Sequence, residues 1–142
     1  MKKLTTKLMI AAVALVAAAS AVSAQTMTAS IPFEFRAGNR VMEPGTYRVD
    51  SSRLTGAPLV WLQNAHSGQQ AVLLAQVPVD PEKAWKAEGR PRLAFACTSG
   101  RCALVEIWGG PGSHAYTFSH PKLGKDEDAY LRVIPMQRGK GE

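Results

Sequence analysis

The residues whose type and spacing most clearly predict chemistry are Cys97 and Cys102, the two cysteines of the 142-residue chain. They enclose the stretch TSGR between two apolar segments, RLAFAC and CALVEIW, which predicts a β-hairpin with a direct cross-strand cysteine pair. Such a pair places its Cα atoms about 4.5 to 5.5 Å apart, within the range of an unstrained disulfide. Because the closed loop is short, the bond should add only about 2 kcal/mol to the free energy of unfolding.

The histidines do not show the spacing of a metal site. His114 and His120 are six residues apart and His66 lies in an earlier turn, whereas zinc sites commonly use closely spaced pairs such as His at i and i+4 or Cys-x-x-Cys. A disulfide would also remove both thiolates from metal binding. We predict no metal and no cofactor, with the histidines at the surface or in loops.

Enzyme signatures are also missing from the sequence. It contains no Gly-x-Ser-x-Gly elbow, and GGPGS lacks the Gly-Lys-Ser/Thr of a phosphate loop. The acidic run Asp126–Asp128 lacks the spacing of a calcium loop and fits the start of a helix better. We predict that the protein is not an enzyme.

Glu106 is the carboxylate with the strongest case for a perturbed environment. Strict alternation places it on an apolar strand face, with Leu93, Phe95 and Leu104. Burial there would raise its pKa unless a nearby arginine, Arg90 or Arg92, paired with it. Because no second carboxylate is placed to work with it, we favour a structural ion pair over a catalytic acid.

The aromatic residues raise the alternative of a sugar-binding surface. Trp61 and Trp108 lie in or at the end of apolar segments, which favours packing in the core. Trp85 lies in a polar segment, so it either pins that segment to the core or stands exposed as a contact residue. The candidate ligand-binding residues are Trp85, His114 and Tyr116, the last two within the loop sequence GGPGSHAY.

Short β-like segments separated by turns must position these groups. The stretch SIPFEF alternates apolar and polar residues, which predicts one apolar strand face, made of Ile31, Phe33 and Phe35. Pro32 cannot donate to a ladder, which places this strand at a sheet edge or at a strand start. RAGNR and EPGTY predict turns, with positive φ available at Gly38, Asn39 and Gly45.

A second pair of segments, LVWLQN from Leu59 and AVLLAQV from Ala71, predicts a hairpin. Both segments are apolar on both faces, so we expect central strands covered on each side. Together these elements predict an all-β, mainly antiparallel fold, a small β-sandwich or barrel with one or two short helices.

Two stretches break the β pattern. DPEKAWKAEG predicts a short helix, with Asp80 as N-cap, Pro81 at the first helical position and Gly89 as the stop. KDEDAYLRVIPM is either a helix ended by Pro135 or a last strand, and we favour the helix.

The first 24 residues have the layout of a secretory signal peptide, with early lysines, an apolar stretch and small residues up to Ala24. The apolar stretch is shorter than the roughly 18 to 20 residues that span a bilayer. We therefore predict cleavage after Ala24, no stable membrane span afterwards, and a single β-rich domain at residues 25–142. The protein is expected to be exported and to be periplasmic or secreted.

The charge does not indicate a nucleic-acid partner. The net charge of +6 falls to about +3 once the three lysines of the signal peptide are removed. The remaining basic residues are scattered, with no run of Lys or Arg and no interleaved aromatic residues.

The order IPFEFRAGNRVMEPGTYRV, HSGQQAVLLAQVPV and RLAFACTSGRCALVEIWGGPG resembles an uncharacterised family of small exported bacterial β-rich proteins. Its members share a pattern of the type PFxFxxGxxxxPxGxYxV, a central two-stranded stretch and a later hairpin that ends in a Trp. The resemblance covers about residues 31–112 and implies a fold rather than an activity. The two cysteines depart from it, since that hairpin tip usually carries other residues in the family.

PGTYRV by itself also resembles the PGxYxV strand of carboxypeptidase-regulatory-like and pilin-type Ig-like domains. Turn residues and alternation account for this motif, so we interpret it as structural rather than ligand-binding. The leading functional hypothesis is an exported, non-enzymatic accessory protein that acts by binding or assembly in the cell envelope or outside the cell, with an unknown envelope protein or glycan as partner. The alternative is a small-ligand or carbohydrate-binding module that uses exposed aromatic residues and loops.

Overall fold

The computed structural model describes residues 26–54, 57–119 and 129–138. The predicted signal peptide, His120 and the acidic run at 126–128 lie outside these ranges. Within them the strands pair in an antiparallel manner, apart from one parallel contact between β2 and β8. The prediction of an all-β, mainly antiparallel fold is confirmed.

The described elements, in chain order, are β1 (Thr26–Ile31), β2 (Phe35–Ala37), β3 (Arg40–Met42), β4 (Gly45–Leu54), β5 (Ala57–Asn64), β6 (Gln70–Val79), α2 (Lys83–Glu88), β7 (Arg92–Thr98), β8 (Arg101–Trp108), β9 (Ala115–Phe118), β10 (Tyr130–Pro135) and β11 (Gln137–Arg138).

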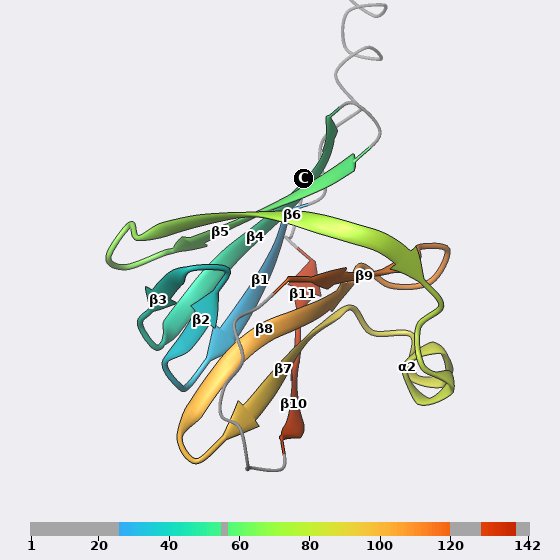
Figure 1. The fold of residues 1–142 in the computed structure, drawn as a ribbon. Helices are drawn as coiled ribbons and strands as arrows, with labels where there is room; N and C mark the ends of the chain where they lie inside the picture. Colours follow the sequence, from blue (N-terminus) through green and yellow to red (C-terminus); the bar gives the residue numbers. More distant parts are fainter. Residues whose placement is uncertain (1–25, 55–56, 120–128, 139–142) are drawn as a thin grey trace, which may run out of the picture.

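One sheet runs in the order β10-β7-β8-β9-β6-β5-β4-β1-β11 and folds over so that its two halves enclose the core (Figure 1). β6 belongs to both halves, because its first part pairs with β5 and its last part with β9. The two ends of this order, β10 and β11, are separated in the chain by Met136 alone. The C-terminal segment therefore pairs with β7 on one side and with β1 on the other, although no ladder among the described strands closes the sheet.

Met136 fixes the point where this segment crosses between the two halves. Its side chain is buried in the core, and its backbone N–H donates to the carbonyl of Pro91 over 2.9 Å. The favoured sequence prediction for this region, a helix ended by Pro135, is wrong. A strand forms instead because both edges of the sheet offer a ladder to this stretch, and such long-range pairing overrides a local helix signal.

The opening motif supplies the centre of the core. Phe35 of β2 makes edge-to-face contacts with Tyr47 of β4 and Phe95 of β7, with both pairs of ring centroids 5.3 Å apart. Phe33 packs edge-on against Phe95 at 5.0 Å. The predicted apolar face is confirmed, but the strand breaks at Pro32, which lies between β1 and β2. These core contacts agree with the interpretation of the opening stretch as structural rather than ligand-binding.

The turn before Tyr47 needs a glycine because of a buried side chain. A Cβ at Gly45 would lie 2.9 Å from Asn64 Nδ2, and Gly45 has φ +156°. Asn64 is buried, and its Oδ1 accepts hydrogen bonds from the backbone N–H groups of His66 and Ser67. Among the predicted turn positions, Gly38 takes positive φ and Asn39 does not.

The two hairpins predicted from sequence both form. β5 and β6 pair in antiparallel register, as do β7 and β8. Cys97 and Cys102 are direct cross-strand partners joined by a disulfide, with their Cα atoms 4.1 Å apart, somewhat closer than expected.

The expectation that β5 and β6 are covered on both faces is wrong. Val60, Leu62 and Leu73 are buried, but Trp61 of β5 is 47% exposed and Leu74 of β6 is 63% exposed. The core-packing prediction therefore holds for Trp108 and fails for Trp61. Apolar composition on both faces does not by itself provide a second covering layer, and among the described elements none packs on this side.

Replacement of Phe35 by alanine should test the role of the aromatic contacts. We expect the free energy of unfolding to fall by about 3 to 5 kcal/mol, as for other large buried rings. The measurement is equilibrium urea unfolding, with Val77→Ala as the control, because Val77 is 77% exposed and should change stability by less than about 0.5 kcal/mol. A loss in Phe35→Ala as small as in the control would contradict the proposed role of this ring.

Candidate functional site

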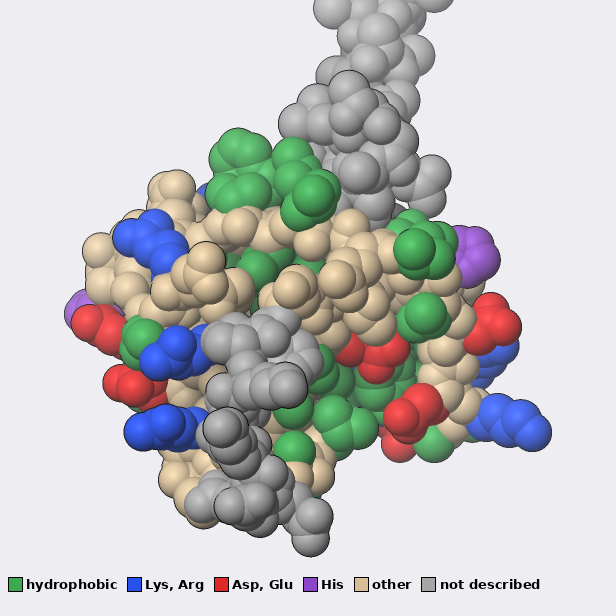
Figure 2. All heavy atoms as spheres, in the orientation of Figure 1, with side chains coloured by type: hydrophobic (Ala, Val, Ile, Leu, Met, Phe, Trp, Pro, Cys, Tyr) green, Lys and Arg blue, Asp and Glu red, His purple; other side chains and the backbone are tan. Residues whose placement is uncertain are grey.

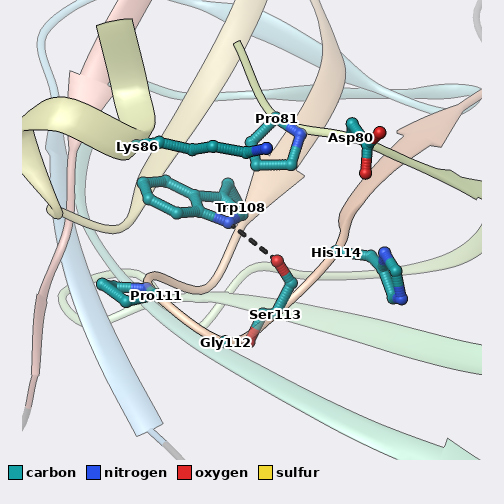
Figure 3. A pocket seen from close by; sticks show the side chains of 8 residues that line it. All are labelled: Asp80, Pro81, Lys86, Trp108, Pro111, Gly112, Ser113 and His114. Carbon is teal, nitrogen blue, oxygen red and sulfur yellow. Dashed lines mark hydrogen bonds between the residues drawn. The ribbon is translucent and has the colours of Figure 1, made fainter. Parts of the chain in front are cut away.

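An open pocket of about 350 Å³ lies where the α2 segment meets the loop between β8 and β9 (Figure 3). We call it the helix-side pocket. Its lining residues are Asp80, Pro81, Lys86, Trp108, Pro111, Gly112, Ser113 and His114. The volume lies at the lower end of the range for sites that hold small molecules.

The floor of the pocket is fixed by a hydrogen bond across the loop. Trp108 is 1% exposed, and its indole N–H donates to the carbonyl of Ser113 over 3.1 Å. The N–H of Ser113 in turn donates to the carbonyl of Gly110 over 3.2 Å. A Cβ at Gly110, which has φ +106°, would lie 3.1 Å from Arg138 Nη2. The loop is therefore fixed by its own turn hydrogen bond and by its close approach to Arg138 of the C-terminal segment.

Trp85 anchors α2 rather than facing solvent. Its ring is 3% exposed and packs in a small second cluster with Ala94, Trp108 and Ala115. The guanidinium carbon of Arg92 lies 5.5 Å from the Trp85 ring centroid, and Arg92 Nη2 lies 2.8 Å from Glu88 Oε2. Of the two sequence alternatives for Trp85, pinning of the helical segment to the core is the one observed. Its buried ring offers no free face to a ligand.

The helix itself differs from the prediction at its start. It begins at Lys83, with Glu82 at the N-cap and no side-chain cap, rather than with Asp80 as N-cap and Pro81 at the first turn. Pro81 is buried, so it packs as part of the connection that precedes the helix. The predicted stop is confirmed, because Gly89 takes the left-handed conformation with φ 67°.

Only one of the three predicted ligand-binding residues lines the pocket. His114 lies at its edge (Figure 3), whereas Tyr116 is half-buried and packs against the main core as the partner of Ile107. Sequence reasoning missed Asp80 and Lys86 as pocket residues. The helical signal of DPEKAWKAEG identified their element, but the sequence held no sign that this element meets the loop after Trp108.

The pocket carries charges of both signs. Asp80, Lys86 and His114 are exposed, and within the described part of the chain no hydrogen bond or ion pair engages their side chains. The one ion pair between described residues is that of Arg92 and Glu88. These three groups are therefore free to contact a ligand.

Glu106 lies on the opposite strand face from the one predicted. A bulge at Val105 shifts the register between β7 and β8, so that Glu106 pairs with Ala94 while Leu104 pairs with Phe95. Glu106 thereby faces the same side as Trp108, away from the main core. Partial burial raises the pKa of the Glu106 carboxyl, and the negative charge of Glu82 raises it further. The predicted ion pair with Arg90 or Arg92 is not formed, since Arg92 pairs with Glu88.

A second candidate site is the solvent-facing side of β5 and β6. Hydrophobic side chains gather there (Figure 2), and they come from two cross-strand pairs, Trp61 with Val72 and Leu59 with Leu74. Val72 is 55% exposed, and Leu59 is half-buried. We call these four residues the outer β5–β6 face.

The described residues hold no group of three or more His, Cys, Asp or Glu side chains that could bind a metal ion. None of their helices is long or apolar enough to cross a membrane.

No family model, curated protein or solved structure matches the chain. The resemblance to small exported β-rich proteins therefore stays a prediction. In the pattern of that family the second proline stands one residue earlier than Pro44 does in this chain.

Replacement of Glu106 by glutamine should reveal the cost of its ionisation. A carboxyl whose pKa is raised in the folded state contributes most stability below the unfolded pKa, about 4.5, and loses it as the pH rises through the folded value. We therefore expect Glu106→Gln to be more stable than the wild type at pH 7, with the difference disappearing below about pH 4.5. Urea unfolding of the wild type and the variant across this pH range measures the stability difference at pH 7 and its disappearance at low pH. A loss of stability at pH 7 in the variant would instead indicate a cationic partner for the carboxylate.

Proposed function

We propose that the protein is an exported, non-enzymatic accessory protein that binds a partner protein through the outer β5–β6 face. The observation that carries this proposal is the exposure of Trp61, Val72 and Leu74 side by side on a regular sheet. Contiguous exposed apolar side chains of this kind mark interaction sites more often than free surface. Tryptophan is also among the residues that contribute most to binding energy at protein interfaces.

The regular ladder beneath makes this face a rigid surface. β5 pairs with β4 over its whole length on one side and with β6 from Leu59 to Gln63 on the other. The opposite side of the same strands is buried through Val60 and Leu62. The outer side chains therefore stand on a backbone that the core already fixes, so binding needs little ordering of the chain.

The charges beside this face indicate the chemistry of the partner. Asp50 of β4 is the cross-strand partner of Trp61, and Arg48 lies two residues earlier on the same side of β4. Asp50 Oδ1 is buried and has no hydrogen-bond partner among the described residues. A partner surface with apolar side chains would cover Trp61, and a basic group at its edge would face the half-buried Asp50 carboxylate.

The disulfide is compatible with the proposed location. A Cys97–Cys102 bond persists in oxidising compartments such as the periplasm or the cell exterior. The signal-peptide pattern of residues 1–24 supports export on independent grounds.

A carbohydrate-binding module that stacks sugars on aromatic rings receives less support. Trp85 and Trp108 are buried, at 3% and 1% exposure. Trp61 is exposed, but Leu59, Val72 and Leu74 beside it form an apolar surface, and the polar groups on this face lie on one side of the ring, at Asp50 and Gln63.

Site-specific photo-crosslinking in cells that make the full-length protein tests the proposal. A photoreactive aromatic residue is placed at Trp61, at Leu74 and, as a control, at Arg101, which is exposed at the β7–β8 turn away from this face. We expect a defined adduct from positions 61 and 74 and none from 101. The adduct mass separates a second copy of the chain from a different protein.

Two surface variants sharpen the result. Leu74→Ser and Asp50→Asn should each reduce the adduct yield at position 61 several-fold, whereas the exposed change Lys83→Gln on α2 should leave it unchanged. The absence of an adduct from both face positions, in cells where the protein is present and exported, would overturn the proposal.

A further inference from the structure

We infer that the helix-side pocket is a second, separate binding site, and that it takes a small zwitterion of the amino-acid or short-peptide class. This inference does not depend on the outer β5–β6 face. It rests on the size of the pocket, its fixed floor and the opposite charges of Asp80 and Lys86 around it.

The charge arrangement selects a ligand with both an ammonium and a carboxylate. Asp80 and Lys86 face the same pocket (Figure 3), yet they are not joined to each other by an ion pair. A ligand ammonium would donate hydrogen bonds to the Asp80 carboxylate, and a ligand carboxylate would accept hydrogen bonds from the Lys86 ammonium and the His114 imidazole. A simple anion would satisfy Lys86 but stand near Asp80, and a simple cation would have the reverse conflict.

The walls and the volume limit the size of the ligand. About 350 Å³ of space is available, bordered by the rings of Pro81 and Pro111. The exposed ring of Pro111 offers apolar contact to the carbon atoms between the two charged ends, while Pro81 is buried in the pocket wall. A single amino acid or a dipeptide fits this description, whereas the site is too small and too open to enclose a long chain.

The pocket is formed before any ligand enters. Trp108 is held by its hydrogen bond to Ser113, and the helix on the other side is held by buried Trp85. At the end of α2, a Cβ built on Gly89 would be 3.7 Å from Pro111 Cγ, so the helix end and the loop lie in close contact. The ligand would therefore bind with little loss of chain entropy.

The experiment is an NMR titration of the purified, disulfide-bonded protein with three matched probes. L-alanyl-L-alanine carries both charges, its N-acetyl derivative lacks the ammonium, and its C-terminal amide lacks the carboxylate. The indole N–H of Trp108 reports on the pocket floor, and that of Trp61 on the outer β5–β6 face serves as the internal control. Maltose is the neutral, polyhydroxylated comparison.

We expect millimolar L-alanyl-L-alanine to shift the Trp108 indole and the Gly112 and Ser113 amides while leaving Trp61 unchanged. Each capped dipeptide should bind about tenfold more weakly, the usual scale for the loss of one charge-assisted contact. In Asp80→Asn, the difference between the free and N-acetylated dipeptides should vanish. In Lys86→Gln, the difference between the free dipeptide and its amide should shrink.

The matched control is Lys83→Gln, which removes an exposed lysine of the same helix that does not line the pocket. It should leave all affinities unchanged. The inference is overturned if the free dipeptide produces no shift, if the capped dipeptides bind as well as the free one, or if only maltose shifts the Trp108 indole. Because the crosslinking at Trp61 involves another face, its outcome is independent of this one.

Discussion

The structure depends on one side chain that contacts both halves of the folded sheet. The ring of Phe35 meets Tyr47 of β4 and Phe95 of β7 at the same centroid distance of 5.3 Å. Phe33 extends the contact, since its ring packs on Phe95 and lies 4.2 Å from the guanidinium carbon of Arg132 in β10. Tyr47 is itself anchored by the hydrogen bond that its hydroxyl donates to the carbonyl of Glu43. The short segment from Phe33 to Phe35 thus joins elements that are distant in sequence.

This central packing leaves the surface as the place where function must lie. The interior between the two halves is filled by apolar side chains, and the second cluster around Trp85 and Trp108 is buried as well. Two surface features of the described residues stand out there: the outer β5–β6 face, which is apolar, and the helix-side pocket, which carries charges of both signs. The two sites differ in chemistry and are built on different elements, so each supports a different kind of partner.

The sequence predicted the features that depend on neighbouring residues and missed those set by distant ones. Both hairpins, the cross-strand Cys97–Cys102 pair and the stop at Gly89 follow from local alternation and turn chemistry, and all of them form. The position of Glu106 could not be predicted, because a bulge of one residue reverses the alternation after Leu104. A last strand at the C-terminus was only the less favoured alternative to a helix, since the ladder partners of this segment, β7 for β10 and β1 for β11, are far away in the chain.

The candidate sites show the same division. Apolar residues on both sides of β5 identified a strand, but only the finished fold shows which side lacks a cover and leaves Trp61 half exposed. The pocket forms where α2 meets the loop after Trp108, and the sequence of neither segment predicts this contact. Of the residues predicted to bind a ligand, His114 lines the pocket because it belongs to that loop.

The claim that the Phe35 ring unites the two halves is tested most directly by native-state hydrogen exchange. If Phe35 joins them into one cooperative unit, the most protected amides of β4–β5 and of β7–β8 should open with the same free energy, equal to that of global unfolding. If one half instead opened at a clearly lower free energy while the other stayed protected, the halves would be separate units. That result would contradict the role of Phe35 as the side chain that unites them.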